Sequence, residues 1–156
     1  MSESGLLKGR VILFVDDRYE ITRLYIERCK AAGAETLYVS RLEDAFTALD
    51  GHAVDVAVLD LHMPAPLPPY GPKYESAIRF FVDNVSSEIR QNNLGQMLGY
   101  HISKTRAGKP PYLYLSAVAA FYIPIPEAGI AEPVCLDRNE KTPAELVEAI
   151  IAVLGQ

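Results

Sequence analysis

Short runs of consecutive apolar residues alternate along the chain with stretches in which apolar residues recur every three or four positions. The runs are rich in β-branched and aromatic residues, which is typical of strands buried on both faces. Strands separated by helices form a parallel sheet with helices on both sides. We therefore predict an α/β fold with five strands, at residues 11–15, 35–39, 54–59, 112–115 and 134–136.

The segments between the predicted strands show helical spacing and helix-end signals. The first helix is predicted from apolar residues at that spacing, Leu24 among them, and Gly33 is its expected C-cap. A capping box of Ser40 and Glu43 predicts where a second helix begins. The last helix is predicted to begin at Thr142, because a cap residue, a first-turn proline and a capping-box glutamate follow one another there.

Two regions interrupt this alternation. Residues 64–72 hold five of the eleven prolines, which predicts an irregular loop. Helical spacing then runs over residues 78–89, and residues 94–102 either continue that face or begin another helix. We interpret residues 64–93 as an insertion between the third strand and the third helix. In the second region, residues 117–133, prolines leave room for only a short piece of helix.

Length and composition fit a single globular domain over residues 1–156, with 49% apolar and 22% charged residues. The net charge of −5, without a basic cluster, disfavours direct DNA binding. No apolar run approaches the roughly 20 residues that a membrane span needs, and the first residues lack a signal-peptide profile. We therefore expect a cytoplasmic protein. Two cysteines without CxxC spacing or a histidine cluster argue against structural zinc and a disulfide scaffold.

Polar residues follow the carboxyl ends of the predicted strands, which lie at one edge of a parallel sheet. Converging carboxylates repel one another and need a cation or a proton, and oxygen ligands suit Mg²⁺. A carboxylate beside that ion can attack phosphorus and form an aspartyl phosphate, while a hydroxyl and a basic side chain hold the phosphoryl oxygens. The residues in question are Asp16, Asp17, Asp60, Ser116 and, as the basic group, Arg138 or Lys141.

Four segments together give the chain a resemblance to response-regulator receiver domains of two-component signalling. These segments are Val11–Asp17, Val56–Pro64, Tyr112–Ala117 and Thr142–Ile150, and they span nearly the whole chain. The stretch LDLHMP, with an acidic pair one strand earlier, is the most specific part. The resemblance implies a doubly wound sheet of five parallel strands in the flavodoxin-like order 2-1-3-4-5.

The resemblance also implies a role for individual residues. Asp60 would accept a phosphoryl group from the phosphohistidine of a histidine kinase or phosphotransfer protein. Asp16, Asp17 and Asp60 would hold Mg²⁺ together with the backbone carbonyl of His62, and Ser116 would bind the phosphoryl group. Such a domain is a switch rather than an enzyme, assisting at most its own phosphorylation and dephosphorylation. Because no output domain fits in this length, we expect a stand-alone receiver that signals to a protein target by contact or by phosphorelay.

Three departures from the family pattern support a second hypothesis. The family lysine after the fifth strand is missing, so that either Arg138 or Lys141 replaces it. Cys135 stands where an aromatic switch residue is expected, and prolines interrupt the fourth helix. The chain would then be an unphosphorylated receiver-like scaffold that acts as a protein-interaction module. Its inserted helix, which includes Phe80 and Phe81, would bind a partner or form a homodimer.

Other interpretations of the same residues are weaker. Asp16 and Asp17 would also suit the start of a helix, since acidic residues are favoured there. Asp60-Leu-His62 is similar to a cobalamin-binding motif, but Ala65 replaces the glycine that this motif requires. A phosphatase with an aspartyl nucleophile usually needs a second aspartate two residues later, where His62 stands.

Overall fold

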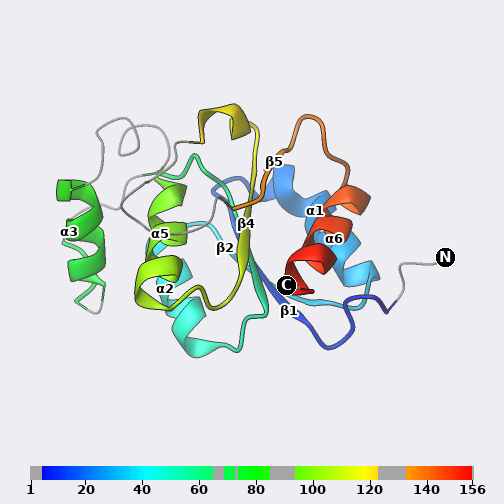
Figure 1. The fold of residues 1–156 in the computed structure, drawn as a ribbon, viewed down its shortest axis with the longest axis horizontal. Helices are drawn as coiled ribbons and strands as arrows, with labels where there is room; N and C mark the ends of the chain where they lie inside the picture. Colours follow the sequence, from blue (N-terminus) through cyan, green and yellow to red (C-terminus); the bar gives the residue numbers. More distant parts are fainter. Residues whose placement is uncertain (1–4, 65–68, 73, 85–93, 123–132, 156) are drawn as a thin grey trace.

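The computed structural model describes residues 5–64, 69–72, 74–84, 94–122 and 133–155. Five parallel strands form one sheet in the order β2-β1-β3-β4-β5, which confirms the predicted fold class (Figure 1). Compared with the prediction, β3 begins two residues later, and the ends of β4 and β5 shift by one. The strands are β1 (Val11–Val15), β2 (Glu35–Val39), β3 (Val56–Leu59), β4 (Tyr112–Ser116) and β5 (Cys135–Asp137).

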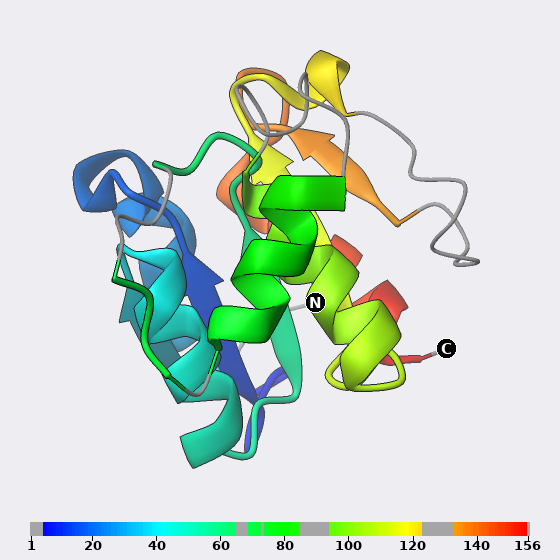
Figure 2. The ribbon, with the colours of Figure 1, turned by 90° about the vertical axis from the view of Figure 1, so that its left-hand side faces the viewer.

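Helices cover both faces of the sheet, as predicted. One face carries α1 (Tyr19–Ala31) and α6 (Pro143–Leu154), and the other carries α2 (Leu42–Gly51) and α5 (Gly95–Thr105). A further helix, α3 (Glu75–Asn84), packs outside α5, so that the helices are two deep on this side (Figure 2). Within the described residues, no helix is both long and apolar enough to cross a membrane.

The three central strands, β1, β3 and β4, bury side chains on both faces, which accounts for their apolar runs, whereas the edge strands β2 and β5 are only partly buried. In β1, Ile12 and Phe14 belong to the core under α1 and α6, whereas Leu13 and Val15 belong to the core under α2 and α5. Alternate side chains of a strand point to opposite faces, so a single run supplies both cores.

Two predicted helix ends have different outcomes. At α6 the capping box is confirmed, because the Glu145 N–H donates to Thr142 Oγ1 at 3.2 Å and the Thr142 N–H donates to Glu145 Oε1 at 3.1 Å. The box of Ser40 and Glu43 is wrong. Helix α2 begins one residue later than this box requires, with Arg41 at the N-cap and no side-chain cap. Glu43 instead forms an ion pair with Arg41 at 3.3 Å.

Leu24 does not lie on the buried face of α1, which corrects the sequence-based prediction. Its side chain is 62% exposed, and the buried positions of the helix are Thr22, Tyr25, Ile26 and Cys29. The polar Thr22 points inward because it hydrogen-bonds to Asp16 at the end of β1. The buried face of α1 therefore includes a polar residue and leaves Leu24 outside it.

The segment after β3 forms two helices with different roles. Helix α5 packs on the sheet and supplies Met97, Leu98 and Ile102 to its core, and α3 contributes the fully buried Ile78. The predicted association surface includes the side chains of Phe80 and Phe81 and residues 85–93, which lie outside the described part. In the second irregular region, only the 3₁₀ helix η1 (Ala119–Phe121) is described before residue 123, in agreement with a short piece of helix.

Candidate functional site

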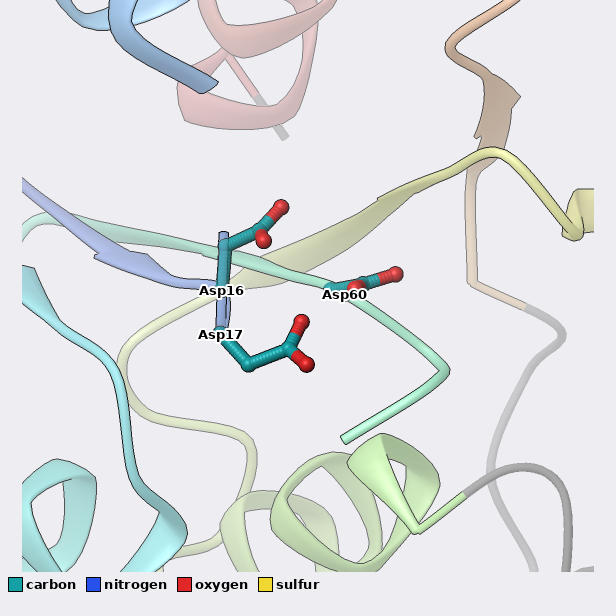
Figure 3. A group of neighbouring side chains, drawn as sticks. All are labelled: Asp16, Asp17 and Asp60. Atoms are coloured by element: carbon teal, nitrogen blue, oxygen red, sulfur yellow. The ribbon is translucent and has the colours of Figure 1, made fainter. Parts of the chain in front are cut away.

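Three aspartates meet at the carboxyl edge of the sheet. Asp16 and Asp17 directly follow β1, and Asp60 directly follows β3, so the parallel register of these neighbouring strands brings them together. One carboxylate oxygen from each lies within 4.8 Å of the others (Figure 3). Asp16 and Asp60 are 3% and 5% exposed, whereas Asp17 is half-buried. Nearly complete burial of two of these acids concentrates negative charge where water solvates it poorly.

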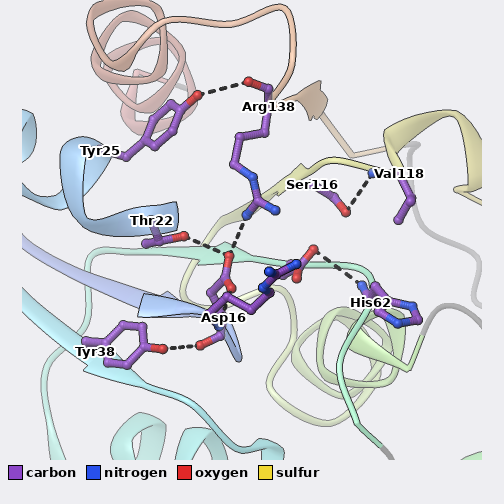
Figure 4. A network of polar contacts seen from close by, with 10 residues as sticks. Asp16, Thr22, Tyr25, Tyr38, His62, Ser116, Val118 and Arg138 are labelled. Atoms are coloured by element: carbon purple, nitrogen blue, oxygen red, sulfur yellow. Dashed lines mark hydrogen bonds and ion pairs between the residues drawn. The ribbon is translucent and has the colours of Figure 1, made fainter. Parts of the chain in front are cut away.

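Asp16 is held by side chains from the α1–α6 side of the sheet. Its Oδ2 accepts hydrogen bonds from Thr22 Oγ1 at 2.7 Å and from Arg138 Nη1 at 2.8 Å, and its Oδ1 accepts one from the Arg18 N–H at 2.8 Å (Figure 4). The ion pair with Arg138 is buried, with the two side chains 10% and 5% exposed. Arg138 therefore supplies a cation to the acidic group from within the chain.

Asp60 is less well compensated than Asp16. Burial, together with the nearby charge of Asp16, raises the pKa of Asp60 to about 6. A hydrogen bond from Ser116 and the positive charge of Arg138 act in the opposite direction but do not cancel this effect. The ionised carboxylate of Asp60 would thus be stabilised by an additional cation beside it.

Ser116 and His62 lie on either side of Asp60. Ser116 is the fully buried last residue of β4, and its Oγ also accepts a hydrogen bond from the Val118 N–H at 3.2 Å. The His62 N–H lies 3.4 Å from Asp60 Oδ1, and the imidazole of His62 is exposed. His62 therefore contacts Asp60 through its backbone amide, and its carbonyl as a metal ligand stays a prediction.

The two basic candidates after β5 are in different places. Arg138 extends into the acidic cluster, whereas the Lys141 ammonium lies 3.7 Å from Glu145 Oε2 on the first turn of α6. The Tyr25 hydroxyl donates to the Lys141 carbonyl at 2.6 Å and lies 3.1 Å from the Arg138 carbonyl. This tyrosine of α1 thereby holds the loop that positions the Arg138 side chain over Asp16.

A glycine brings α5 against the backbone of Asp60. A Cβ atom on Gly95, the first residue of the helix, would lie 1.7 Å from the Asp60 carbonyl oxygen and 2.9 Å from Leu61 Cα. The Gly95 N–H donates to the Leu61 carbonyl at 2.7 Å, and the Met63 N–H donates to the same carbonyl at 3.2 Å. Met63 and Gly95, which are more than 30 residues apart in the sequence, therefore lie next to each other beside Asp60.

Sequence reasoning missed four residues that shape the site: Thr22, Tyr25 as a polar contact, Tyr38 and Gly95. The Tyr38 hydroxyl donates to the backbone carbonyl of Asp16, and burial and the charges of Asp16 and Asp17 raise its pKa to about 12. Thr22 had a usable signal, since a hydroxyl in the first turn of the helix that follows an acidic pair can reach back to it. No local pattern marks Tyr38 or Gly95, because their partners lie on other strands.

The three aspartates fit a magnesium ion. Mg²⁺ prefers carboxylate oxygens, binds through bonds of about 2.1 Å and keeps several waters. Ligand oxygens of such an ion are about 3–4 Å apart, so the observed spacing of Asp16, Asp17 and Asp60 requires only small side-chain movements. The raised pKa of Asp60 also indicates an acidic group that Arg138 alone does not neutralise.

Comparisons with known proteins show similarity in fold but not in sequence. No protein-family model and no curated protein matches this chain. A sensor protein from Polaromonas sp. JS666 superposes with a TM-score of 0.65 at 12% identity, over 94% of this chain and 97% of that one. A CheY-like response regulator receiver domain protein from Methanospirillum hungatei JF-1 gives 0.61 at 16% identity, over 94% of both chains. The chemotaxis response regulator CheY4 of Vibrio cholerae gives 0.58 at 16% identity, over 92% and 98%.

Proposed function

We propose that this chain is a response-regulator receiver that accepts a phosphoryl group on Asp60. The observation that carries the proposal is the meeting of Asp16, Asp17 and Asp60 at one strand edge, within a fold shared with receiver domains. Ser116 and Arg138 contribute a hydroxyl and a cation at the same edge. This set holds a nucleophile, oxygen ligands for a hard cation and two groups that can bind phosphoryl oxygens.

The proposed step is transfer from a phosphohistidine of a histidine kinase or phosphotransfer protein. A carboxylate oxygen of Asp60 forms a bond to phosphorus while the bond from phosphorus to the donor's imidazole nitrogen breaks. The imidazole leaves as a neutral group after it takes up a proton. At pH 7, a pKa of about 6 leaves most Asp60 side chains ionised, as a nucleophile requires.

Residues around Asp60 would bind the negatively charged phosphoryl group. Asp16, Asp17 and Asp60 would hold Mg²⁺, which supplies positive charge to the phosphoryl oxygens when bound. The Ser116 hydroxyl, which is buried beside Asp60 and lowers its pKa, would donate to a phosphoryl oxygen. Arg138 would act as the phosphate-binding cation in place of a lysine, and its planar guanidinium would donate two hydrogen bonds rather than one.

Phosphorylation of Asp60 would change the contacts that Arg138 and Ser116 make. Arg138 bonds to Asp16 when Asp60 is unmodified. A phosphoryl group on Asp60 would offer Arg138 a second, more highly charged partner beside the first, and would compete for the Ser116 hydroxyl. The β5–α6 and β4–η1 loops, which carry Arg138 and follow Ser116, are therefore the segments expected to report phosphorylation to a protein target.

The deciding experiment is intact mass spectrometry after incubation with phosphoramidate, a small donor with a phosphorus–nitrogen bond, and Mg²⁺. We expect a gain of one phosphoryl group that is lost on Asp60→Asn, or when EDTA replaces Mg²⁺. Asp44→Asn, which changes an exposed carboxylate of α2, is the matched control and should phosphorylate normally. Phosphorylation that persists in Asp60→Asn, or a folded protein that gains no mass with any donor, would refute the proposal.

One observation favours a second function, an unphosphorylated scaffold. Arg138 already occupies Asp16 Oδ2, so part of the acidic charge is neutralised without a metal. A chain of this kind would work through α3 as a protein-interaction module or homodimer contact. It is distinguished by the absence of both phosphorylation and Mn²⁺ binding, the latter measured by paramagnetic broadening of amide signals around Asp17.

A further inference from the structure

A cavity of about 710 Å³ lies among helices α2, α3 and α5, and none of Asp16, Asp17 and Asp60 lines it. Its lining comes from α2, from Tyr74 and the first turn of α3, and from α5 between Met97 and Arg106. Small-molecule sites typically enclose about 300–1,000 Å³, so the space has the size of a ligand site. Helix α3, which packs outside α5 (Figure 2), contributes Ser76 and Ala77 to the lining.

The walls of the cavity are largely apolar and firmly held. Met97 and Tyr74 are 1% and 9% exposed, and Ala77 and Tyr100 are half-buried beside them. The Tyr74 ring stacks on Phe46 of α2 with ring centroids 4.6 Å apart, which fixes its orientation. A site built from a thioether, a methyl group and two aromatic rings suits the apolar or aromatic body of a small molecule.

Two of the charged residues at the cavity, Asp50 and Arg106, form an ion pair, so their charges cancel. Asp50 accepts hydrogen bonds from the Tyr74 hydroxyl at 2.5 Å and from Arg106 Nη1 at 2.8 Å. Arg106 also donates to the Leu49 carbonyl at 3.2 Å and to the Lys109 carbonyl at 2.9 Å. These contacts tie the end of α2 to the end of α5, and they leave neither charge available to a ligand.

The remaining charge at the cavity is positive. Lys104 lines it from α5, is exposed, and forms no ion pair with any residue that the structure describes. His101 contributes little charge at neutral pH, because burial and the neighbouring Arg106 lower its pKa. The lining therefore has a net charge of about +1 in a chain whose net charge is −5. This local reversal of sign favours an anion over a cation.

We propose that the cavity binds a small amphipathic carboxylate. Its apolar or aromatic body would lie between Met97, Ala77 and the rings of Tyr74 and Tyr100, and its carboxylate would pair with Lys104. This inference is independent of phosphorylation, because none of these residues belongs to the acidic cluster. The proposed ligand site lies where two helices, α3 and α5, follow β3 and interrupt the regular alternation of strand and helix.

The test uses 4-phenylbutyrate as the probe and follows the backbone amide signals of the full chain by NMR, without Mg²⁺ or a phosphodonor. 4-Phenylbutanol and 4-phenylbutylamine are matched probes that replace the carboxylate by a neutral and a cationic group. We expect saturable shifts confined to α2, α3 and α5, with the carboxylate binding about fivefold more tightly than the alcohol. The amine should bind most weakly, and added salt should narrow these differences.

Two variants locate the binding site. Lys104→Gln should abolish the preference for the carboxylate over the alcohol, while Lys30→Gln, an exposed lysine of α1 on the other face of the sheet, should leave it unchanged. Ala77→Phe should fill the cavity and weaken all three probes, and circular dichroism checks its folding. Shifts outside these helices, no saturable shifts, or equal affinities that Lys104→Gln does not alter would each overturn the proposal. Because Asp60 takes no part, failure here leaves phosphorylation untouched.

Discussion

On the α1–α6 face of the sheet, side chains hold the helices by polar contacts: Thr22 and Arg138 on Asp16, Tyr25 on the loop after β5, and a capping box at the start of α6. On the α2–α5 face, Asp50 binds Tyr74 and Arg106 at the helix ends, and close packing at two glycines adds to these polar contacts. Gly95 and Gly99 let α5 approach β3 and β4 more closely than a Cβ would allow.

The two faces also treat the two buried acids differently. Asp16 receives three hydrogen bonds, one of them from a cation, on the α1–α6 side. Asp60 is packed beside α5, and its pKa is raised to about 6. The two buried acids of the cluster therefore differ: Asp16 is paired with a cation, whereas the environment of Asp60 disfavours its ionised form. A carboxylate with a raised pKa, such as Asp60, is typical of a functional site, where the charge of a residue changes during function.

The largest effect is expected from Gly95→Ala. The added methyl group would lie 1.7 Å from a backbone oxygen, which cannot rotate away, so α5 must move off β3. We expect a loss of about 4 kcal/mol in the free energy of unfolding, measured by urea denaturation. Gly51→Ala, at the end of α2 with nothing within 4 Å, is the control and should stay within about 1 kcal/mol of the wild type. Equal effects at the two glycines would contradict close packing of α5 on Asp60.

Arg138→Met tests the buried ion pair between Arg138 and Asp16. Removing the guanidinium leaves Asp16 buried without a cation beside two other acids, and we expect a loss of about 3–4 kcal/mol. Millimolar Mg²⁺ should restore part of this stability if the acids bind the ion. Arg41→Met removes an exposed ion pair of α2 and should cost less than about 1 kcal/mol. An Arg138→Met protein as stable as the wild type in EDTA would show that the ion pair does not hold this edge together.

Asp60 predicts an unusual dependence of stability on pH in the metal-free protein. Its folded-state pKa of about 6 lies above the ordinary value of 3.8, so its stabilising contribution is complete below about pH 4 and is lost as the pH rises through 6. The loss amounts to about 3 kcal/mol. Asp60→Asn should therefore be more stable than the wild type at pH 7.5, by thermal unfolding in EDTA, and Asp44→Asn should not. An Asp60→Asn protein of lower stability at pH 7.5 would argue against an uncompensated charge.

Gly99→Ala probes the second close approach of α5. Its Cβ would lie 2.0 Å from the Tyr114 hydroxyl oxygen and 2.9 Å from a ring carbon of Tyr112. Because the nearest atom belongs to a side chain, we expect a smaller loss than at Gly95, about 2 kcal/mol. Adding Tyr114→Phe removes that oxygen and should recover part of the loss. A double-mutant cycle from chemical denaturation measures this coupling, and strictly additive effects would mean that the hydroxyl is not the obstacle.

The smallest effect is expected at the capping box of α6. Thr142→Ala removes the acceptor of the Glu145 N–H and should cost about 1 kcal/mol without changing the site. Thr142→Ser keeps that acceptor and should cost little. Thermal unfolding compares the two variants, and an alanine variant as stable as the serine variant would show that the end of α6 is held by packing alone.

Much of the fold followed from local signals in the chain. All five strands were predicted to within two residues at each end. For the central strands β1, β3 and β4 the reason is that a strand buried on both faces requires a nearly unbroken apolar run. The capping box at Thr142 was correct because helix capping involves only neighbouring residues. The box at Ser40 was wrong because α2 begins at Leu42 with Arg41 at its N-cap, so Ser40 lies one residue too early to cap it, and Glu43 pairs with Arg41.

For the candidate site, the sequence by itself determined which groups reach the edge of the sheet. Asp16, Asp17, Asp60 and Ser116 are adjacent to strand ends, and strand order then brings them together. Only the tertiary structure shows that Arg138 contacts the acidic cluster whereas Lys141 pairs with Glu145, because Tyr25 of a distant helix holds the loop that carries both basic residues. The tertiary structure also brings Gly95 against Asp60 and makes the first turn of α3 part of the lining of a cavity. These contacts join residues far apart in the chain, and no local pattern of apolar and polar positions records the distance between them.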